Sequence, residues 1–228
     1  MDGPVRKVKL SRHSLHHEVA ASVRQMIIHG DLKAGEKIPV AGICAMLGVS
    51  QTPLREALKI LAEERLVTIE VNRGARVSVY SVEEAVNLFE VIAVIEGLAA
   101  ELTCARMTGS VLATLEDLHG RMTSAFHAVN KDTYFDLNSA IHHEIIEACG
   151  NEELQLVHQR LMLRAERGRY MAIMDEGRWS QAFEEHETLM KALRSGDVAG
   201  AGAIWRVHLV NTGRALERAF RTFRLGEN

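Results

Sequence analysis

The sequence has few residues that interrupt a helix. Its 228 residues include only three prolines, Pro4, Pro39 and Pro53, so most of the chain lacks the residue that removes a backbone donor and breaks helices. Aromatic residues, which are common in strands, make up only 5%. Alanine and leucine, which are strong helix formers, are frequent. These features predict a mainly α-helical protein.

Other absences narrow the class of protein further. The three cysteines, Cys44, Cys104 and Cys149, are widely separated and form no Cys-x-x-Cys pair, which argues against a disulfide framework or a thiolate zinc site. We expect them to be small buried apolar residues. No run approaches the ~20 apolar residues of a membrane span, and the basic first segment lacks the apolar centre of a signal peptide. We therefore expect a cytoplasmic protein without a membrane partner.

Charge is distributed unevenly along the chain. The net charge is −3, but residues 1–80 carry 12 Lys/Arg and 8 Asp/Glu, whereas residues 81–228 carry 15 and 22. The first part is therefore at +4 and the second at −7. This asymmetry favours contact with a polyanion by the first part alone.

Residues 1–80 are predicted to contain three helices and a hairpin. Apolar periodicity gives a first helix that ends at Gly30 and a short second helix that ends near Gly48. The third begins after Ser50, a good N-cap residue, and has Pro53 in its first turn. The runs "LVTIE" and "ARVSV", separated by the turn "VNRG", predict two short strands. Together these elements predict a winged helix-turn-helix.

This arrangement places the first turn of the third helix in the major groove of DNA. On the third helix the predicted contacts are Ser50, Gln51, Thr52 and Arg55, and at the tip of the wing they are Arg73 and Gly74. On the first helix Arg24 is expected to contact a phosphate. The alternative is a small helical domain whose basic residues are merely solvated.

The stretch "GDLKAGEKI…LGVSQTPLREALKILAEERLVTIEVNRGARV" resembles the DNA-binding domain of the GntR family of bacterial transcription regulators. The resemblance covers about residues 15–80 and implies operator binding. Two residues depart from the family pattern: Gln51 stands where arginine is usual, and Val40 where an acidic residue is usual. Because arginine favours guanine and glutamine favours adenine, we expect an operator that differs from the commoner family sequence at that base pair.

A second domain is predicted from residue 81 onwards. Ser81 and Glu84 form a capping box that begins a long helix, so the predicted domains are residues 1–80 and 81–228. Only helices are predicted in the second domain, with glycines at or beside the breaks, and they form an antiparallel bundle. The predicted helices are 82–107, 110–129, 131–149, 152–174, 179–195 and 197–220.

Three histidines of this domain fall on apolar helix faces. At 100° per residue, His142 lies about 100° from Ile141, inside the apolar face of its helix, and Asn138 lies on the same face. His186 and His208 lie at the centres of the apolar faces of two further helices. The neighbouring His143 and the more distant His127 point away from the apolar faces, so we expect them to be solvated.

Three buried imidazoles need partners, because an unpaired buried imidazole is costly. Imidazoles suit divalent transition metals, so the two explanations are a metal site and a purely polar buried network.

The stretches "LNSAIHHEIIEACGNEEL", "EEHETLMKALRSGD" and "WRVHL" resemble the FCD ligand-sensing domain of the FadR subgroup of the GntR family. The resemblance implies a metal held by Asn138, His142, His186 and His208, with zinc first and nickel or manganese as further choices. It also implies a small-molecule effector, a carboxylate, that reaches the metal. Asn138 is neutral where other members carry aspartate, which implies a lower metal affinity.

The sequence lacks the arginine that pairs with the carboxylate of the effector in many members of this subgroup. Many members have an arginine in a pattern like "R-x-x-L-E" on the first helix of the domain, whereas this chain has Ile92 in "IAVIE". Arg164 is a candidate replacement, and Thr212, on the face of His208, is a second predicted effector contact. A snorkelling arginine at the edge of its helix is the plainer interpretation of Arg164.

These observations predict a DNA-binding transcription regulator that acts as a homodimer on operator DNA. The resemblance to the GntR family implies that it is a repressor. The alternatives are a metal-dependent enzyme and a metal that only stabilises the bundle. An enzyme would need a general base, and Glu144 is predicted to face away from His142. Glu96 is the other acidic candidate, but the sequence has no His-Glu-x-x-His spacing, phosphate loop or nucleophile motif.

Overall fold

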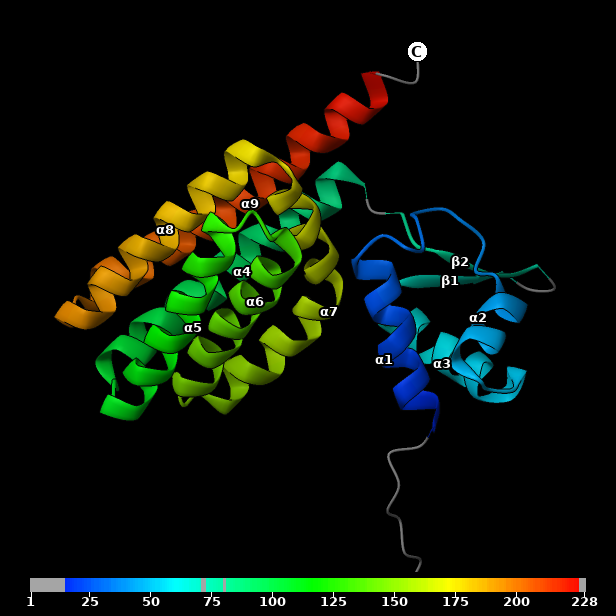
Figure 1. Ribbon diagram of the computed structural model, residues 1–228, viewed down its shortest axis with the longest axis horizontal. Helices are drawn as coiled ribbons and strands as arrows, with labels where there is room; N and C mark the ends of the chain where they lie inside the picture. Colours follow the sequence, from blue (N-terminus) through cyan, green and yellow to red (C-terminus); the bar gives the residue numbers. More distant parts are fainter. Residues whose placement is uncertain (1–14, 71–72, 80, 226–228) are drawn as a thin grey trace, which may run out of the picture. The chain divides into compact units, whose positions relative to one another are not determined.

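A computed structural model describes residues 15–70, 73–79 and 81–225 (Figure 1). The contacts divide the chain between Ser78 and Val79, two residues before the boundary predicted from the capping box. Half of the predicted turn "VNRG" lies outside the described residues. Each of the two units has its own core.

The first unit is a winged helix-turn-helix, as predicted. Its two strands pair antiparallel, with Val67 opposite Val77 and Glu70 opposite Gly74. Buried aliphatic residues from all three helices and both strands form one core. The elements are α1 (Leu15–Ile28), α2 (Val40–Leu47), α3 (Gln51–Glu63), β1 (Val67–Glu70) and β2 (Gly74–Val77).

The turn between α2 and α3 depends on two residues. Gly48 ends α2 at φ 65°, a left-handed conformation that a residue without a β-carbon adopts at little cost. Ser50 occupies the N-cap of α3, as expected, but its side chain makes no capping hydrogen bond. The exposed Ser50 hydroxyl is therefore available at the start of the helix.

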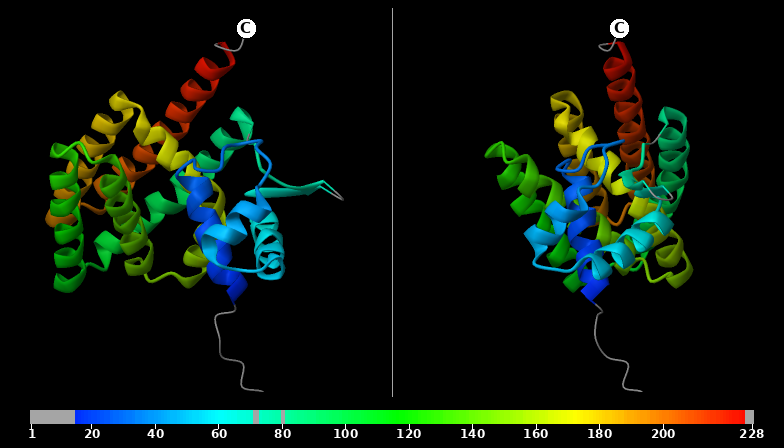
Figure 2. Two further views of the ribbon diagram at one scale, coloured as in Figure 1. Left: turned by 45° about the vertical axis from the view of Figure 1, so that its right-hand side comes forward. Right: turned by 90° about the vertical axis from the view of Figure 1, so that its right-hand side faces the viewer.

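The second unit is the predicted helical bundle (Figure 2). Its described elements are α4 (Val82–Ala105), α5 (Gly109–His127), α6 (Lys131–Ala148), α7 (Glu152–Met174), α8 (Glu176–Ser195) and α9 (Val198–Leu225). The capping box at the start of α4 is present, with Ser81 and Glu84 each bonded to the other's backbone N–H at 3.0 Å. None of the described helices is both long and apolar enough to span a bilayer.

The two longest helices, α4 and α9, lie against each other and run antiparallel (Figure 2). A β-carbon added at Gly213 of α9 would stand 2.9 Å from the β-carbon of Phe89 on α4. Glycine is thus required there by the close approach of the two helices. This contact fixes the position of α9, which carries one of the three inward histidines.

Some boundaries differ from the sequence prediction. The helix expected to begin at residue 179 begins at Glu176, because Asp175 caps it by accepting a hydrogen bond from Arg178 N at 2.7 Å. The last helix continues to Leu225 rather than ending at residue 220. Of the cysteines, Cys104 and Cys149 are buried as expected, whereas Cys44 is only partly buried.

Candidate functional sites

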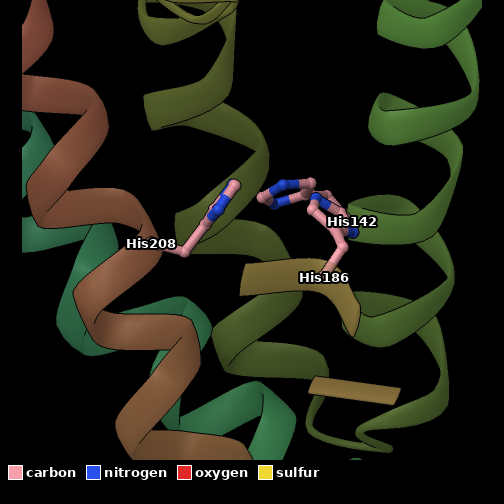
Figure 3. Close-up of side chains that lie close together, drawn as sticks. All are labelled: His142, His186 and His208. Carbon is pink, nitrogen blue, oxygen red and sulfur yellow. The ribbon is translucent and has the colours of Figure 1, made fainter. Parts of the chain in front are cut away.

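Three imidazoles from three helices meet in the core of the bundle. His142 comes from α6, His186 from α8 and His208 from α9, and their rings point toward one another (Figure 3). One ring nitrogen from each lies within 4.8 Å of the others, and none of the three residues is more than 3% exposed. Trp205 stacks on His208 with ring centroids 4.6 Å apart and helps to exclude water. The burial predicted from the helix faces is confirmed.

A buried carboxylate orients the first imidazole. Glu96 of α4 is fully buried, and its carboxylate accepts hydrogen bonds from Nδ1 of His142 and, at 3.0 Å, from Nε2 of His158. Burial alone would raise the pKa of Glu96, but the two histidines outweigh it and hold that pKa well below 4.5. Burial and the positive charge of Arg169 lower the pKa of His142 to about 4. At neutral pH Glu96 is therefore ionised, and His142 is neutral with its Nε2 lone pair directed away from Glu96.

A second carboxylate orients His208. Oε2 of Glu185 lies 2.7 Å from Nδ1 of His208 and 2.8 Å from Nη1 of Arg178. A carboxylate only accepts, so His208 carries its proton on Nδ1 and keeps a lone pair on Nε2. Nη2 of Arg178 also donates to the His208 carbonyl at 2.9 Å and to Oγ1 of Thr212 at 3.0 Å. Thr212, predicted as an effector contact, thus forms part of this network.

His186 is held by the predicted fourth ligand, Asn138. Nε2 of His186 lies 2.7 Å from Oδ1 of Asn138, which is 3% exposed. Burial lowers the pKa of His186 well below its usual value, so this imidazole is neutral too. Nδ1 of His186 and Nε2 of His142 are both buried without a hydrogen-bond partner among the described residues.

This donor set fits a divalent transition metal. The three imidazoles are neutral, and carboxylate or amide partners orient them, as is usual for metal-ligating histidines. The two unpartnered nitrogens would regain partners on binding an ion, and this would offset the free-energy cost of burying them without hydrogen bonds. The cluster therefore offers three nitrogen ligands in a dry core, and the amide oxygen of Asn138 lies beside them on Nε2 of His186.

A cavity of about 690 Å³ between α6 and α7 reaches His142 and His158. Arg164, the cation predicted for the effector, is half-buried on α7 and is not among the residues that line this cavity. Arg169, one and a half turns further along α7, does line it and is only 4% exposed. Ile92, at the place of the usual arginine, is fully buried. The role predicted for Arg164 stays a prediction, and the structure offers Arg169 as an alternative.

The predicted DNA-contacting side chains of α3 lie on the surface. Ser50, Gln51, Thr52 and Arg55 are exposed, and Nη2 of Arg55 donates to Oε1 of Gln51 at 3.4 Å. A groove within the first unit brings Gln51 and Arg55 together with Arg73 and Gly74 of the hairpin; Lys37 and Lys59 line it as well. These two lysines were not predicted from the sequence.

In the structure Arg24 pairs with a carboxylate, whereas the sequence predicted that it contacts a DNA phosphate. Its Nε and Nη2 donate to the carboxylate of Glu64 at 2.9 and 2.6 Å, and both side chains are partly buried. This pair joins α1 to the end of α3. A phosphate at Arg24 would therefore compete with Glu64.

Five buried groups around the histidines were not predicted as their partners from the sequence, although Glu96 was considered as a general base: Glu96, His158, Arg169, Arg178 and Glu185. Three of them carry a signal in the helical period. Glu96 follows the buried Ile92 by four residues, Arg169 follows His158 by eleven, and Glu185 follows Arg178 by seven, so the members of each pair share one helix face.

Comparison with known proteins identifies both units. Residues 15–77 match the bacterial regulatory proteins of the gntR family, and residues 87–211 match the FCD domain. The chain belongs to the GntR family of transcription regulators and carries an FCD domain. It is thus a DNA-binding regulator rather than an enzyme, and the alternative of a metal-dependent enzyme is set aside.

Among individual proteins, the chain is 28% identical over 193 residues to the HTH-type transcriptional repressor GlaR of Escherichia coli, covering 81% of this chain and 87% of that one. It is 24% identical to the gluconate operon transcriptional repressor of Bacillus licheniformis, over 82% of this chain and 79% of that one. The solved structure of E. coli McbR/YncC shares the fold, with a TM-score of 0.75, 18% identity, and coverage of 95% and 100% of the two chains.

Proposed function

We propose that this regulator, a member of the FadR subgroup, is a repressor whose operator binding is modulated by a small carboxylate bound beside a metal in the FCD domain. The observation that carries the proposal is the buried cluster of His142, His186 and His208, whose nitrogens lie within 4.8 Å of one another. Relatives named as repressors, GlaR among them, support the direction of regulation.

The proposed ligands are the three histidines together with Asn138. Bound zinc, nickel or manganese would act as a Lewis acid that accepts a carboxylate oxygen of the effector in an open position. Glu96 and Glu185 hold the imidazoles of His142 and His208 in the tautomer that leaves Nε2 free. Trp205 stacks on His208 and helps to exclude water from the same core. The ligating side chains are already packed in place there, so they need little reorganisation when a metal ion binds.

The metal content of the purified, untagged protein tests this proposal. We expect close to one transition metal ion per chain by mass spectrometry. If the protein holds no metal, even after reloading with zinc, nickel and manganese, the histidines form only a polar buried network. A metal that raises thermal stability, with no ligand effect on operator affinity, would favour the alternative of a purely structural site.

We also propose that the chain binds its operator as a homodimer. A winged helix-turn-helix reads one half-site, and two copies related by a two-fold axis read an inverted repeat. Light scattering should give a mass of about twice 25.3 kDa for the free protein. A monomer that remains monomeric on the operator would contradict this.

Replacing Gln51 by arginine should change operator preference. Glutamine pairs best with adenine N6 and N7, and arginine with guanine O6 and N7, with about 1–3 kcal/mol of discrimination at that base pair. Selection of binding sites from random DNA should therefore give adenine with the wild type and guanine with Gln51→Arg at one position of each half-site. The same base selected by both proteins would show that Gln51 does not read it.

Replacing Glu96 by glutamine should weaken metal binding by about 10- to 100-fold, the usual effect of losing a carboxylate partner of a ligating histidine. The substitution keeps the shape but removes the charge that orients His142. Competition with a zinc-chelating dye measures the affinity. Glu144→Gln, on α6 and without a hydrogen bond to the cluster, is the matched control and should keep the wild-type affinity.

A further inference from the structure

The cavity between α6 and α7 has the size of a ligand site. Its volume of about 690 Å³ falls in the range of about 300–1,000 Å³ that is usual for small-molecule pockets. It reaches the imidazole of His142 at its inner end, and residues of α6 and α7 form its walls. It therefore provides a route from the surface of the FCD domain to the histidine cluster.

Three polar groups that line this cavity are buried without hydrogen-bond partners among the described residues: Nη2 of Arg169, Oγ of Ser139 and Nε2 of His142. Arg169 is 96% buried, since its exposed fraction is 4%. A buried donor without a partner costs about 1–3 kcal/mol, and more when it is charged. Nη2 of Arg169 and Oγ of Ser139 are hydrogen-bond donors, so together they indicate a ligand with acceptor oxygens. Nε2 of His142 carries a lone pair and is the nitrogen available to the metal.

The charged residues that line the cavity indicate whether the ligand is a cation or an anion. Arg169 is the only arginine or lysine among the described lining residues. The carboxylates of Glu96 and Glu166 lie within electrostatic range of its guanidinium, but Glu96 already accepts hydrogen bonds from two histidines. Nη2 of Arg169 has no hydrogen-bond partner among the described residues, so Arg169 has a donor to offer to one anionic group.

The walls and the mouth restrict the rest of the ligand. Ile146, Met162 and Leu163 supply apolar surface, which favours an alkyl or aryl body. Glu147 and Glu152 are exposed lining residues and give the mouth a negative potential. A ligand with several negative charges would be repelled on entry, whereas a single carboxylate can be neutralised by the buried Arg169.

We propose that this cavity binds a monocarboxylate with an apolar body, and that Arg169 is the cation that receives its carboxylate, with Ser139 as a second donor. This inference rests on the proposed function and names the effector class and its subsite. Arg169 takes the part that the sequence suggested for Arg164. The carboxylate then lies between the guanidinium of Arg169 and the histidine cluster, and the apolar body lies against the wall of α6 and α7.

The test is calorimetric titration of the wild-type protein, carrying its metal, with phenylacetate and hexanoate. Phenylacetamide is the uncharged control and citrate the multiply charged control. We expect phenylacetate or hexanoate to bind, and phenylacetamide and citrate to bind at least about tenfold more weakly. Arg169→Gln should weaken binding at least about tenfold, whereas Arg164→Gln should leave it unchanged.

Folding and metal content of each variant are measured on the same preparations, and Arg169→Lys, which keeps the charge, should retain part of the affinity. Wild-type affinity in Arg169→Gln, loss in Arg164→Gln alone, citrate binding tighter than both monocarboxylates, or no binding of either monocarboxylate would each overturn the assignment. A wild type that holds no metal but still loses carboxylate affinity in Arg169→Gln would contradict the proposed metal site alone, because the variant is compared with wild type of the same metal content.

Discussion

The double variant His142→Ala/His186→Ala should contain almost no transition metal after purification, against about one ion per chain in the wild type. It removes two of the three imidazoles of the cluster, and a single histidine with Asn138 cannot hold a divalent ion at the low free concentrations of a cell. Thermal unfolding should then no longer respond to added zinc, whereas the wild type gains stability as ligand binding to the folded state requires.

The matched control for this variant is His127→Ala/His143→Ala, which removes the same number of imidazoles from exposed positions in the same unit. It should keep the metal content of the wild type. Equal metal in both double variants would mean that the ion is bound elsewhere on the chain.

A second large effect is expected at the DNA-binding surface. Arg55→Ala should weaken operator binding by at least about tenfold per half-site, because a base or phosphate contact from arginine contributes about 1–3 kcal/mol. Arg55 is exposed on α3 beside Gln51 and lines the groove that the hairpin completes. Fluorescence anisotropy with a labelled operator measures the change.

Arg121→Ala, at an exposed arginine of α5, is the control for nonspecific loss of positive charge and should bind the operator as the wild type does. An unchanged operator affinity in Arg55→Ala would exclude this face of α3 from the interface. Circular dichroism distinguishes loss of contact from loss of fold.

The helical period predicted the fold and the three inward histidines because each depends on local geometry. The spacing of apolar residues shows which face of each helix is buried. The inward positions of His142, His186 and His208 could therefore be inferred without knowing which helices are in contact. The solvated positions of His127 and His143 followed from the same argument.

The partners of these histidines depend on packing between helices, which the period of a single helix does not contain. Glu96 meets His142 across 46 residues of sequence, and His186 meets Asn138 across 48. Arg169 was missed for a different reason. An arginine on a helix usually extends its charge to water, and only a cavity or a carboxylate supplied by another helix makes its burial tolerable.

Control of DNA binding by a ligand in the FCD domain is tested most directly by operator affinity. The dissociation constant for the selected operator is measured with metal-loaded protein, with metal-stripped protein, and with metal-loaded protein saturated with phenylacetate. The account predicts that phenylacetate raises this constant by about 5- to 150-fold, the usual range of coupling between two sites. The same constant in all three states would contradict it.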